Sequence, residues 1–146
     1  MAYFAREQYV HWADCDAAGI VWFGNFLRFL EDSEEDMFRS LGHNRQDVLE
    51  RLGIWMPRTN FQVGFRSPAK LNDLLEIRME VASLTDRRLT WAFSIRQKSD
   101  PNIVVCEGEY RIACVSSANF KPCPYPEEVR TLLAPYTRPA DAGAGA

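Results

Sequence analysis

The chain has 146 residues, of which 47% are apolar and 25% are charged, and its formal net charge is −3. This length favours a single domain with a substantial buried core, and the composition is that of an ordinary globular protein. The negative charge argues against nonspecific binding to nucleic acid, and no apolar run approaches the length of a membrane span, so we expect neither a nucleic-acid partner nor a membrane partner.

The first half of the chain predicts a strand, a loop and a helix. Residues 5–12 alternate partly between apolar and polar side chains, which is typical of a strand. The loop that follows contains two glycines, which give its backbone freedom. From Asn25 to Leu41 the apolar residues recur at helical spacing, with Asn25 as the expected N-cap and Gly42 as the stop signal.

The predicted helix has two distinct faces. The residues expected to share its apolar face are Phe26, Leu30, Ser33, Met37 and Leu41, with Leu27 and Phe38 beside them. The acids of its outer face, which we interpret as a solvated surface, are Glu31, Asp32, Glu35 and Asp36. The i,i+4 spacing predicts an ion pair between Arg28 and Asp32 and another between Glu35 and Arg39.

The second half of the chain predicts a short helix followed by strands with short connections. The short helix runs from Asn44 to Leu52 and ends at Gly53. Strict alternation of apolar residues is clearest around Ile77 and around Phe93. Strands are expected at residues 54–66, 74–84, 88–98 and 103–115, turn-rich connections at 67–73 and 99–102, a helical turn at 126–133 and a flexible tail at 138–146.

This order of elements predicts an α+β fold. Short connections favour antiparallel neighbours, so the strands are expected to form a five-stranded antiparallel sheet. One long helix packs on one face of that sheet. We therefore expect a single domain over residues 1–137, followed by the tail at residues 138–146.

The cysteines and histidines indicate no metal site. Four cysteines, at positions 15, 106, 114 and 123, form no C-x-x-C pair, and the two histidines, His11 and His43, lie far apart in the sequence. The first seven residues lack the basic-then-apolar plan of a signal peptide. We therefore expect reduced thiols, a cytoplasmic location and no metal.

The loop between the first strand and the helix carries the most informative chemistry. Asp14 and Asp16 lie among small and apolar residues, directly before the predicted start of the helix. Such a carboxylate can act as a base or a nucleophile, and the helix N-terminus offers N–H groups to a developing negative charge. Cys15 is a poor candidate nucleophile, because the adjacent carboxylates suppress its thiolate. We interpret Asp14 as structural, holding the loop or accepting backbone N–H groups.

This loop and the helix after it resemble those of hotdog-fold acyl-CoA thioesterases, and most closely the 4-hydroxybenzoyl-CoA thioesterase family. The resemblance covers residues 5–117, with weaker matches at Ser67-Pro68-Ala69 and at residues 73–77. The family pattern begins with Asp-x-Asp-x-x-Gly and continues through apolar and aromatic residues to the helix. In this chain it is Asp14-Cys15-Asp16-Ala17-Ala18-Gly19-Ile20-Val21-Trp22-Phe23-Gly24-Asn25-Phe26.

The resemblance implies a reaction and a set of roles. Asp16 takes the place of the catalytic acid, as general base or as nucleophile, and a backbone N–H near Phe23 and Gly24 polarises the thioester carbonyl. The substrate is a small or aromatic acyl-CoA, and coenzyme A is part of the substrate, so no separate cofactor is expected. Active sites in such proteins lie between subunits, which implies a dimer or a dimer of dimers.

Substrate-binding residues follow from the same comparison. Basic residues are expected to bind the CoA phosphates, with Arg87 and Arg88 as first candidates at a turn between two strands. Ordinary solubility of a hairpin explains these two arginines equally well. Weaker basic candidates are Arg58, Arg66, Lys70 and Lys121. Trp22, Asn25 and Phe26 are the other predicted substrate-binding residues, and Phe23, Trp55 and Trp91 are further candidates for the acyl pocket, although aromatic residues more often pack in a core.

Two positions of this chain depart from the family pattern. Many members carry Tyr or His in place of Phe23. Many carry a basic or small residue in place of Glu34, and we expect Glu34 to alter the outer surface of the helix or a subunit interface.

Three other functions are alternatives to a thioesterase for acyl-CoA. A hotdog dehydratase is disfavoured, because a His-Phe-x-x-x-Pro signature is absent. A thioesterase for acyl-carrier-protein substrates and a non-catalytic acyl-CoA-binding module remain open.

Overall fold

Five antiparallel strands form the main sheet, in the spatial order β1-β4-β5-β6-β3. The structure is a computed structural model, and it describes residues 3–139. A separate two-stranded sheet pairs β2 (Ile54–Trp55) with β7 (Val115–Ser116). The strands of the main sheet are β1 (Phe4–Tyr9), β3 (Arg58–Phe65), β4 (Leu74–Leu84), β5 (Arg88–Gln97) and β6 (Val104–Ala113).

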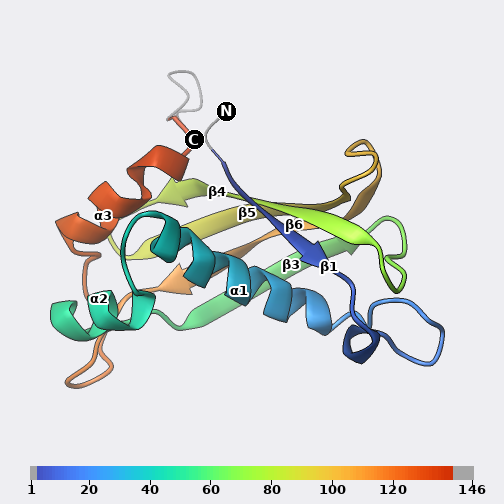
Figure 1. Cartoon of the computed structure of the whole chain (residues 1–146). Coiled ribbons are helices and arrows are strands. Elements are labelled where there is room, and N and C mark those ends of the chain that lie inside the picture. Colours follow the sequence, from blue (N-terminus) through green and yellow to red (C-terminus); the bar gives the residue numbers. More distant parts are fainter. Residues whose placement is uncertain (1–2, 140–146) are drawn as a thin grey trace.

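The helices occupy one face and one end of this sheet. Helix α1 (Asn25–Ser40) has 16 residues and packs against β1 and β4 across one face of the sheet (Figure 1). Helices α2 (Arg45–Leu52) and α3 (Glu127–Leu133) lie together at one end, and the loop before α1 lies at the other. Short 3₁₀ turns at Trp12–Asp14 and Ala134–Tyr136 complete the elements. The predicted α+β arrangement is confirmed.

Alternation along β4 and β5 builds most of the core. Leu75, Ile77, Met79 and Val81 of β4 are buried, as are the corresponding apolar residues of β5. Successive side chains of a strand point to opposite faces, so one face of each strand turns toward α1 and the core. The direct pairing of Ile77 with Ile95 follows from this register. Both strands begin at the predicted residue.

Helix α1 differs in several details from the sequence expectation. Gly24, not Asn25, precedes the first helical residue, so the predicted N-cap is wrong. Leu27 is 50% exposed at the edge of the apolar face. Glu34, expected at the outer surface or an interface, is only 3% exposed. The residues of α1 that are buried are Phe26, Phe29, Leu30, Ser33, Glu34, Met37 and Phe38.

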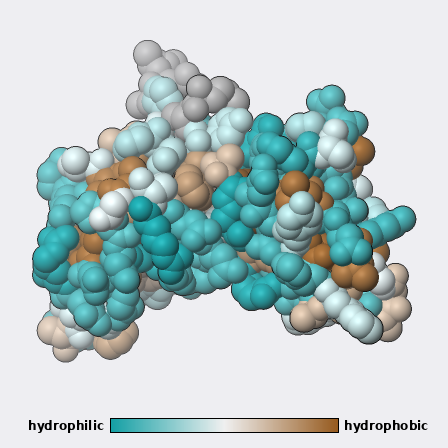
Figure 2. Space-filling model, viewed as in Figure 1, coloured by the Kyte–Doolittle hydropathy of each residue, from teal (hydrophilic) through white to brown (hydrophobic). Residues whose placement is uncertain are grey.

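One of the two predicted ion pairs on α1 is present. Arg39 contacts Glu35 at 2.9 Å between nitrogen and oxygen. Arg28 instead pairs with Asp14 of the preceding loop, because this partner is buried and lies within reach of the first helical turn. The acidic outer side of α1 remains largely hydrophilic, and Figure 2 shows hydrophilic residues over much of the face on which α1 lies.

The predicted strand over residues 54–66 is divided into β2 and β3. Pro57 has no N–H to donate to a sheet, and it lies between the two strands. The two strands have different partners: β2, before the break, pairs with β7, and β3, after it, pairs with β6. Of the predicted tail, Arg138 donates its backbone N–H to the Val81 carbonyl at 2.8 Å, and residues 140–146 lie outside the described part of the chain.

Candidate active site

Asp16 begins a tight turn in the loop that leads to α1. The Gly19 N–H donates to the Asp16 carbonyl at 3.0 Å, and the Asp16 N–H donates to the Ile20 carbonyl at 2.9 Å. Gly19 has a φ of +78°, which is the left-handed region that glycine adopts without strain. The carboxylate oxygen Oδ1 of Asp16 accepts the Ala18 N–H at 2.8 Å. The turn thus holds an exposed carboxylate in a defined position.

Asp14 anchors the loop to α1. Its side chain is buried, with a residue exposure of 2%, and Oδ2 accepts the His11 N–H at 2.8 Å while Oδ1 accepts from Arg28. Its carbonyl accepts from the Trp22 N–H at 3.0 Å and from the Asn25 side-chain nitrogen at 2.8 Å. The structural role predicted for Asp14 agrees with these contacts. Asn25 is the first helical residue and donates its side-chain amide back to the loop, so it joins the helix to the loop instead of capping it.

Replacing Asp14 by Ala should therefore destabilise the loop and the protein. The substitution leaves the part-buried His11 N–H without its acceptor and removes the partner of Arg28, so we expect the free energy of unfolding to fall by about 2 kcal/mol. Urea unfolding followed by circular dichroism measures this change. Asp32→Ala, which removes an acid from the outer side of α1, is the matched control, with an expected change within about 0.5 kcal/mol. Equal effects of the two substitutions would contradict the anchoring role.

The residues just before α1 present free donors. Within residues 3–139, neither the Phe23 N–H nor the Gly24 N–H donates to a backbone carbonyl. Free N–H groups at a helix start, together with the helix dipole, stabilise negative charge. The Trp22 ring lies against Gly24 so closely that a Cβ there would come within 2.2 Å of it. Only glycine at position 24 allows this ring position.

A groove of about 420 Å³ is lined by both Asp16 and Phe23, the residue just before Gly24. Phe23 and Phe26 contribute from the start of α1, and Phe65 faces them from the end of β3, with its ring 6.0 Å from that of Phe26 and 6.5 Å from that of Phe23 between centroids. The remaining lining residues are Ile20, Val21, Arg66, Ser67, Pro68 and Ala69. A carboxylate and aromatic walls thus meet in one groove beside the start of α1.

Phe65 was not among the predicted site residues, and Arg66 was only a weaker basic candidate. Both lie at the junction of β3 with the connection to β4, about 50 residues after Asp16 in the sequence. The available signal was the Ser67-Pro68-Ala69 match, which marks this connection as part of the family pattern. Of the basic candidates for binding the CoA phosphates, Arg66 is the one that lines the groove of Asp16.

The structure does not bring Arg87 and Arg88 to this groove within one chain. They lie at the turn between β4 and β5, as predicted, but Asp16 follows β1, whose last residue pairs with Leu74 at the opposite end of β4. The rise of about 3.3 Å per residue along β4 separates the two ends by roughly 33 Å. Trp55 and Trp91 also lie away from the groove, and Trp91 is buried in the core.

Cys15 is electrostatically unsuited to act as a nucleophile. Partial burial first, and then the negative charges of Asp14 and Asp16, raise the pKa of its thiol above the ordinary value. Its side chain faces the His11 carbonyl, with the sulfur 3.6 Å from the oxygen. Asp16 is therefore the stronger candidate for chemistry in this loop.

The described residues contain neither a cluster placed to hold a metal ion nor a helix that could span a membrane. Within residues 3–139, no group of three or more His, Cys, Asp or Glu side chains is placed to hold a metal ion. No helix in this part of the chain is both long and apolar enough to cross a membrane.

With this geometry established, the comparisons with known proteins identify the family. Residues 10–133 match the Thioesterase-like superfamily. The chain belongs to this superfamily. Membership confirms the prediction of a thioesterase-like enzyme at the level of the superfamily, and the matched residues include the whole loop, α1 and the main-sheet strands after it.

Relatives within the superfamily include named thioester hydrolases. The chain is 26% identical over 127 residues to 1,4-dihydroxy-2-naphthoyl-CoA hydrolase of Thermosynechococcus vestitus, which covers 87% of this chain and 86% of the relative. It is 28% identical over 120 residues to acyl-CoA thioester hydrolase YbgC of Escherichia coli, which covers 82% of this chain and 87% of the relative.

Solved structures of the superfamily confirm the predicted hotdog fold. A 1,4-dihydroxy-2-naphthoyl-CoA thioesterase from Synechocystis superposes with a TM-score of 0.82 at 22% identity, over 90% of this chain and 96% of that protein. A 4-hydroxybenzoyl-CoA thioesterase variant in complex with 4-hydroxybenzoyl-CoA superposes with a TM-score of 0.78 at 22% identity, over 91% and 99%. At these identities the likeness establishes the fold.

Proposed function

We propose that this protein hydrolyses acyl-CoA thioesters with a compact or aromatic acyl group to the free acid and CoA. The observation that carries the proposal is the groove lined by both Asp16 and Phe23, at the start of α1 where the Phe23 and Gly24 N–H groups donate to no backbone carbonyl. The aromatic walls of this groove suit a flat acyl group. Relatives named for 1,4-dihydroxy-2-naphthoyl-CoA support the same substrate class.

The groove supplies the two things that thioester hydrolysis needs. The thioester oxygen accepts from the Phe23 and Gly24 N–H groups, which stabilise the negative charge of the tetrahedral intermediate. In one route Asp16 takes a proton from water, whose oxygen bonds to the carbonyl carbon. The carbon–sulfur bond then breaks and CoA leaves as a thiolate, which needs no strong acid.

In the other route Asp16 is itself the nucleophile. Its carboxylate bonds to the carbonyl carbon, CoA thiolate leaves, and water hydrolyses the resulting mixed anhydride. One turnover in ¹⁸O-labelled water tests for the anhydride. Label on Asp16 establishes the anhydride with attack at the Asp16 carbonyl, whereas label in the released acid alone is expected both for direct attack by water and for an anhydride hydrolysed at the acyl carbonyl.

We further propose that the working unit contains at least two chains. Strand β3 is an edge of the sheet, and exposed apolar side chains flank the groove beside it. A second copy that pairs its own β3 with this edge would cover both. The exposed apolar residues in question are Trp22, Phe23, Leu27, Phe61 and Phe65. Analytical ultracentrifugation should show dimers or tetramers, and a fully active monomer would overturn this proposal.

Such pairing also brings Arg87 and Arg88 of one chain toward the substrate of the other. Antiparallel pairing of two β3 strands reverses the second sheet, so the β4–β5 turn of one copy lies at the same end as the Asp16 groove of the other. The CoA phosphates would then meet Arg66 of one chain and this turn of the next. Weaker binding of CoA by the Arg87→Ala/Arg88→Ala variant, measured calorimetrically, would support the arrangement, and unchanged binding would remove it.

Thiol release from a panel of acyl-CoA thioesters tests the proposed activity. The panel contains benzoyl-, hydroxybenzoyl-, phenylacetyl-, acetyl- and palmitoyl-CoA. We expect the highest kcat/KM among the aromatic members. If the protein hydrolyses none of them, the proposal is overturned. Hydrolysis of an acyl-carrier-protein thioester would then indicate a carrier-protein thioesterase, and binding of CoA without turnover would indicate a non-catalytic acyl-CoA-binding module.

A further inference from the structure

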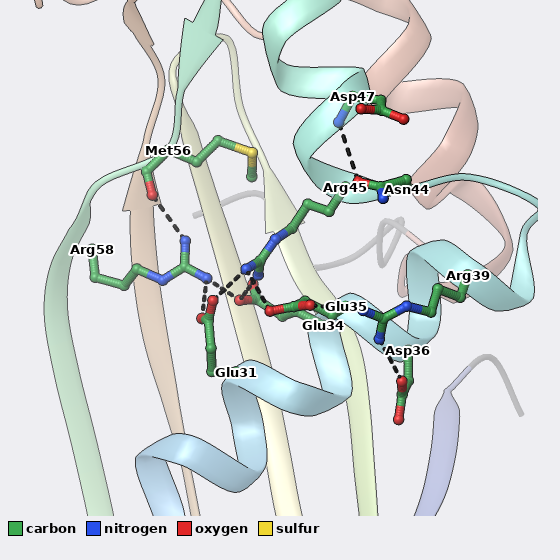
Figure 3. A network of polar contacts seen from close by, with 10 residues as sticks. All are labelled: Glu31, Glu34, Glu35, Asp36, Arg39, Asn44, Arg45, Asp47, Met56 and Arg58. Atoms are coloured by element: carbon green, nitrogen blue, oxygen red, sulfur yellow. Dashed lines mark hydrogen bonds and ion pairs between the residues drawn. The ribbon is translucent and has the colours of Figure 1, made fainter.

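An ion network with one buried carboxylate, that of Glu34, occupies the middle of α1. Glu34 is 3% exposed and pairs with Arg58 at the start of β3 and with Arg45 of α2, whose nitrogen lies 3.3 Å from its carboxylate oxygen. Glu31 also pairs with both arginines, and Glu35 also pairs with Arg45 (Figure 3). The network thus ties α1 to α2 and to the sheet edge.

Two cavities lie on opposite sides of the Glu34–Arg58 pair. The α1–β3 cavity, of about 640 Å³, is walled by Leu27, Leu30 and Phe61 among others. The α2–α3 cavity, of about 310 Å³, is walled by apolar side chains that include Leu49, Trp91 and Leu133. Glu34 and Arg58 are the two residues that line both cavities. The ion pair is therefore a shared wall.

The α1–β3 cavity continues the groove of Asp16 along the same two elements. Phe26 and Phe65 line the groove, whereas Leu30 and Phe61, one turn along α1 and four residues back along β3, line the cavity. A helix rises about 1.5 Å per residue, so Glu34 lies about 12 Å beyond Phe26 along α1. An acyl group that enters beside Asp16 therefore points toward the Glu34–Arg58 pair.

Each cavity is lined by one residue with a buried polar side-chain atom. Tyr110 lines the α1–β3 cavity, and burial first, and then the charge of the Glu34 carboxylate, raises the pKa of its hydroxyl. Trp91 lines the α2–α3 cavity, and within residues 3–139 its Nε1 has no hydrogen-bond partner. Buried donors are almost always satisfied in folded proteins, so the Trp91 Nε1 indicates space there for water or a ligand.

We propose that the Glu34–Arg58 pair sets the length limit of the acyl group. This inference rests on the proposed thioesterase function. A compact acyl group fills the α1–β3 cavity and ends at the pair. A long alkyl chain would have to push aside the packed side chains of Glu34 and Arg58 to reach the apolar α2–α3 cavity, and forcing extra atoms into packed space is unfavourable. Removing the wall joins the two cavities and admits longer chains.

Substitutions at Glu34 separate the volume of the wall from its charge. Glu34→Ala removes the wall and leaves Arg58, whose side chain is 38% exposed, free to turn to water. Glu34→Gln, the matched control, keeps the volume without the charge. The measurement is the ratio of kcat/KM for octanoyl- and palmitoyl-CoA to kcat/KM for benzoyl-CoA. We expect Glu34→Ala to raise this ratio about tenfold or more, and Glu34→Gln to leave it near the wild-type value.

Each outcome of this experiment bears on the inference. A wild type that hydrolyses benzoyl-CoA but shows the same ratio as Glu34→Ala would overturn the length limit and leave the proposed function standing. A wild type without turnover overturns both. A ratio raised equally in Glu34→Gln would overturn the inference that the volume of the Glu34 side chain sets the length limit. If Glu34→Ala does not fold, Arg58→Ala opens the wall from its more exposed side, with the same expected rise in the ratio.

Discussion

Replacing Asp16 by Asn is expected to lower kcat for benzoyl-CoA by about 100- to 10 000-fold, the range that a positioned general base typically contributes. Asn has nearly the same shape and can still accept the Ala18 N–H, so the turn around Gly19 is retained. It can neither take a proton from water nor attack a carbonyl. The proposed oxyanion donors, the Phe23 and Gly24 N–H groups, are untouched, so we expect KM to change much less than kcat.

Thiol release at saturating substrate measures the effect. Circular dichroism and thermal unfolding establish that the variant is folded, and Asp32→Asn, a neutralised acid on the outer side of α1, controls for the loss of one negative charge. An unchanged kcat in Asp16→Asn would remove Asp16 from the mechanism. A similar loss in both variants would show that net charge, rather than the groove, determines the rate.

The strands show what local sequence can predict. The period-2 alternation of β4 and β5 is a local property, and it located the first residue of both strands. Pro57 carried the information that divides β2 from β3, because a proline cannot donate to a sheet. The prediction of one strand over residues 54–66 gave too little weight to that missing N–H.

The burial of Glu34 had no local signal. Helical spacing alone placed the neighbouring acids on a solvated face, and Glu34 interrupts the apolar face as a charged residue. Its two partners, Arg45 and Arg58, follow 11 and 24 residues later. Only their convergence in the folded chain makes the burial of this carboxylate possible, and that convergence depends on the tertiary structure.

The candidate site divides in the same way. Asp16, Phe23 and Gly24 belong to one short loop, so their proximity could be predicted from a single motif. Phe65 reaches the groove from the sheet, and Arg87 and Arg88 lie at the far end of it. The turn that holds the two arginines was predicted correctly, but its distance from Asp16 depends on the direction of β4 relative to β1, which the sequence pattern does not contain.

The stability of the protein is expected to fall as pH rises from about 5 to about 8. Burial raises the pKa of Glu34 to about 7, against the opposing charges of Arg58 and Arg45, from an ordinary value of 4.5. The folded state therefore binds this proton more tightly than the unfolded state does. Between these two pKa values the free energy of unfolding decreases with pH, by about 3 kcal/mol in total, because each pKa unit corresponds to about 1.4 kcal/mol.

Urea unfolding of the wild type and of Glu34→Gln at pH 5 and pH 8 isolates this contribution. The amide does not titrate, so we expect the variant to lose most of the decrease that the wild type shows. Equal decreases in the two proteins would assign the pH dependence to other groups.

The two roles of Glu34 then separate experimentally. Its protonation changes the charge of the wall but not its volume, so we expect the acyl-length ratio of the wild type to stay constant between pH 6 and pH 8 while its stability changes. Glu34→Gln should reproduce that constancy, because the amide occupies the same space. A length preference that follows the titration of Glu34 would mean that the charge of the pair, rather than its bulk, excludes the longer chains.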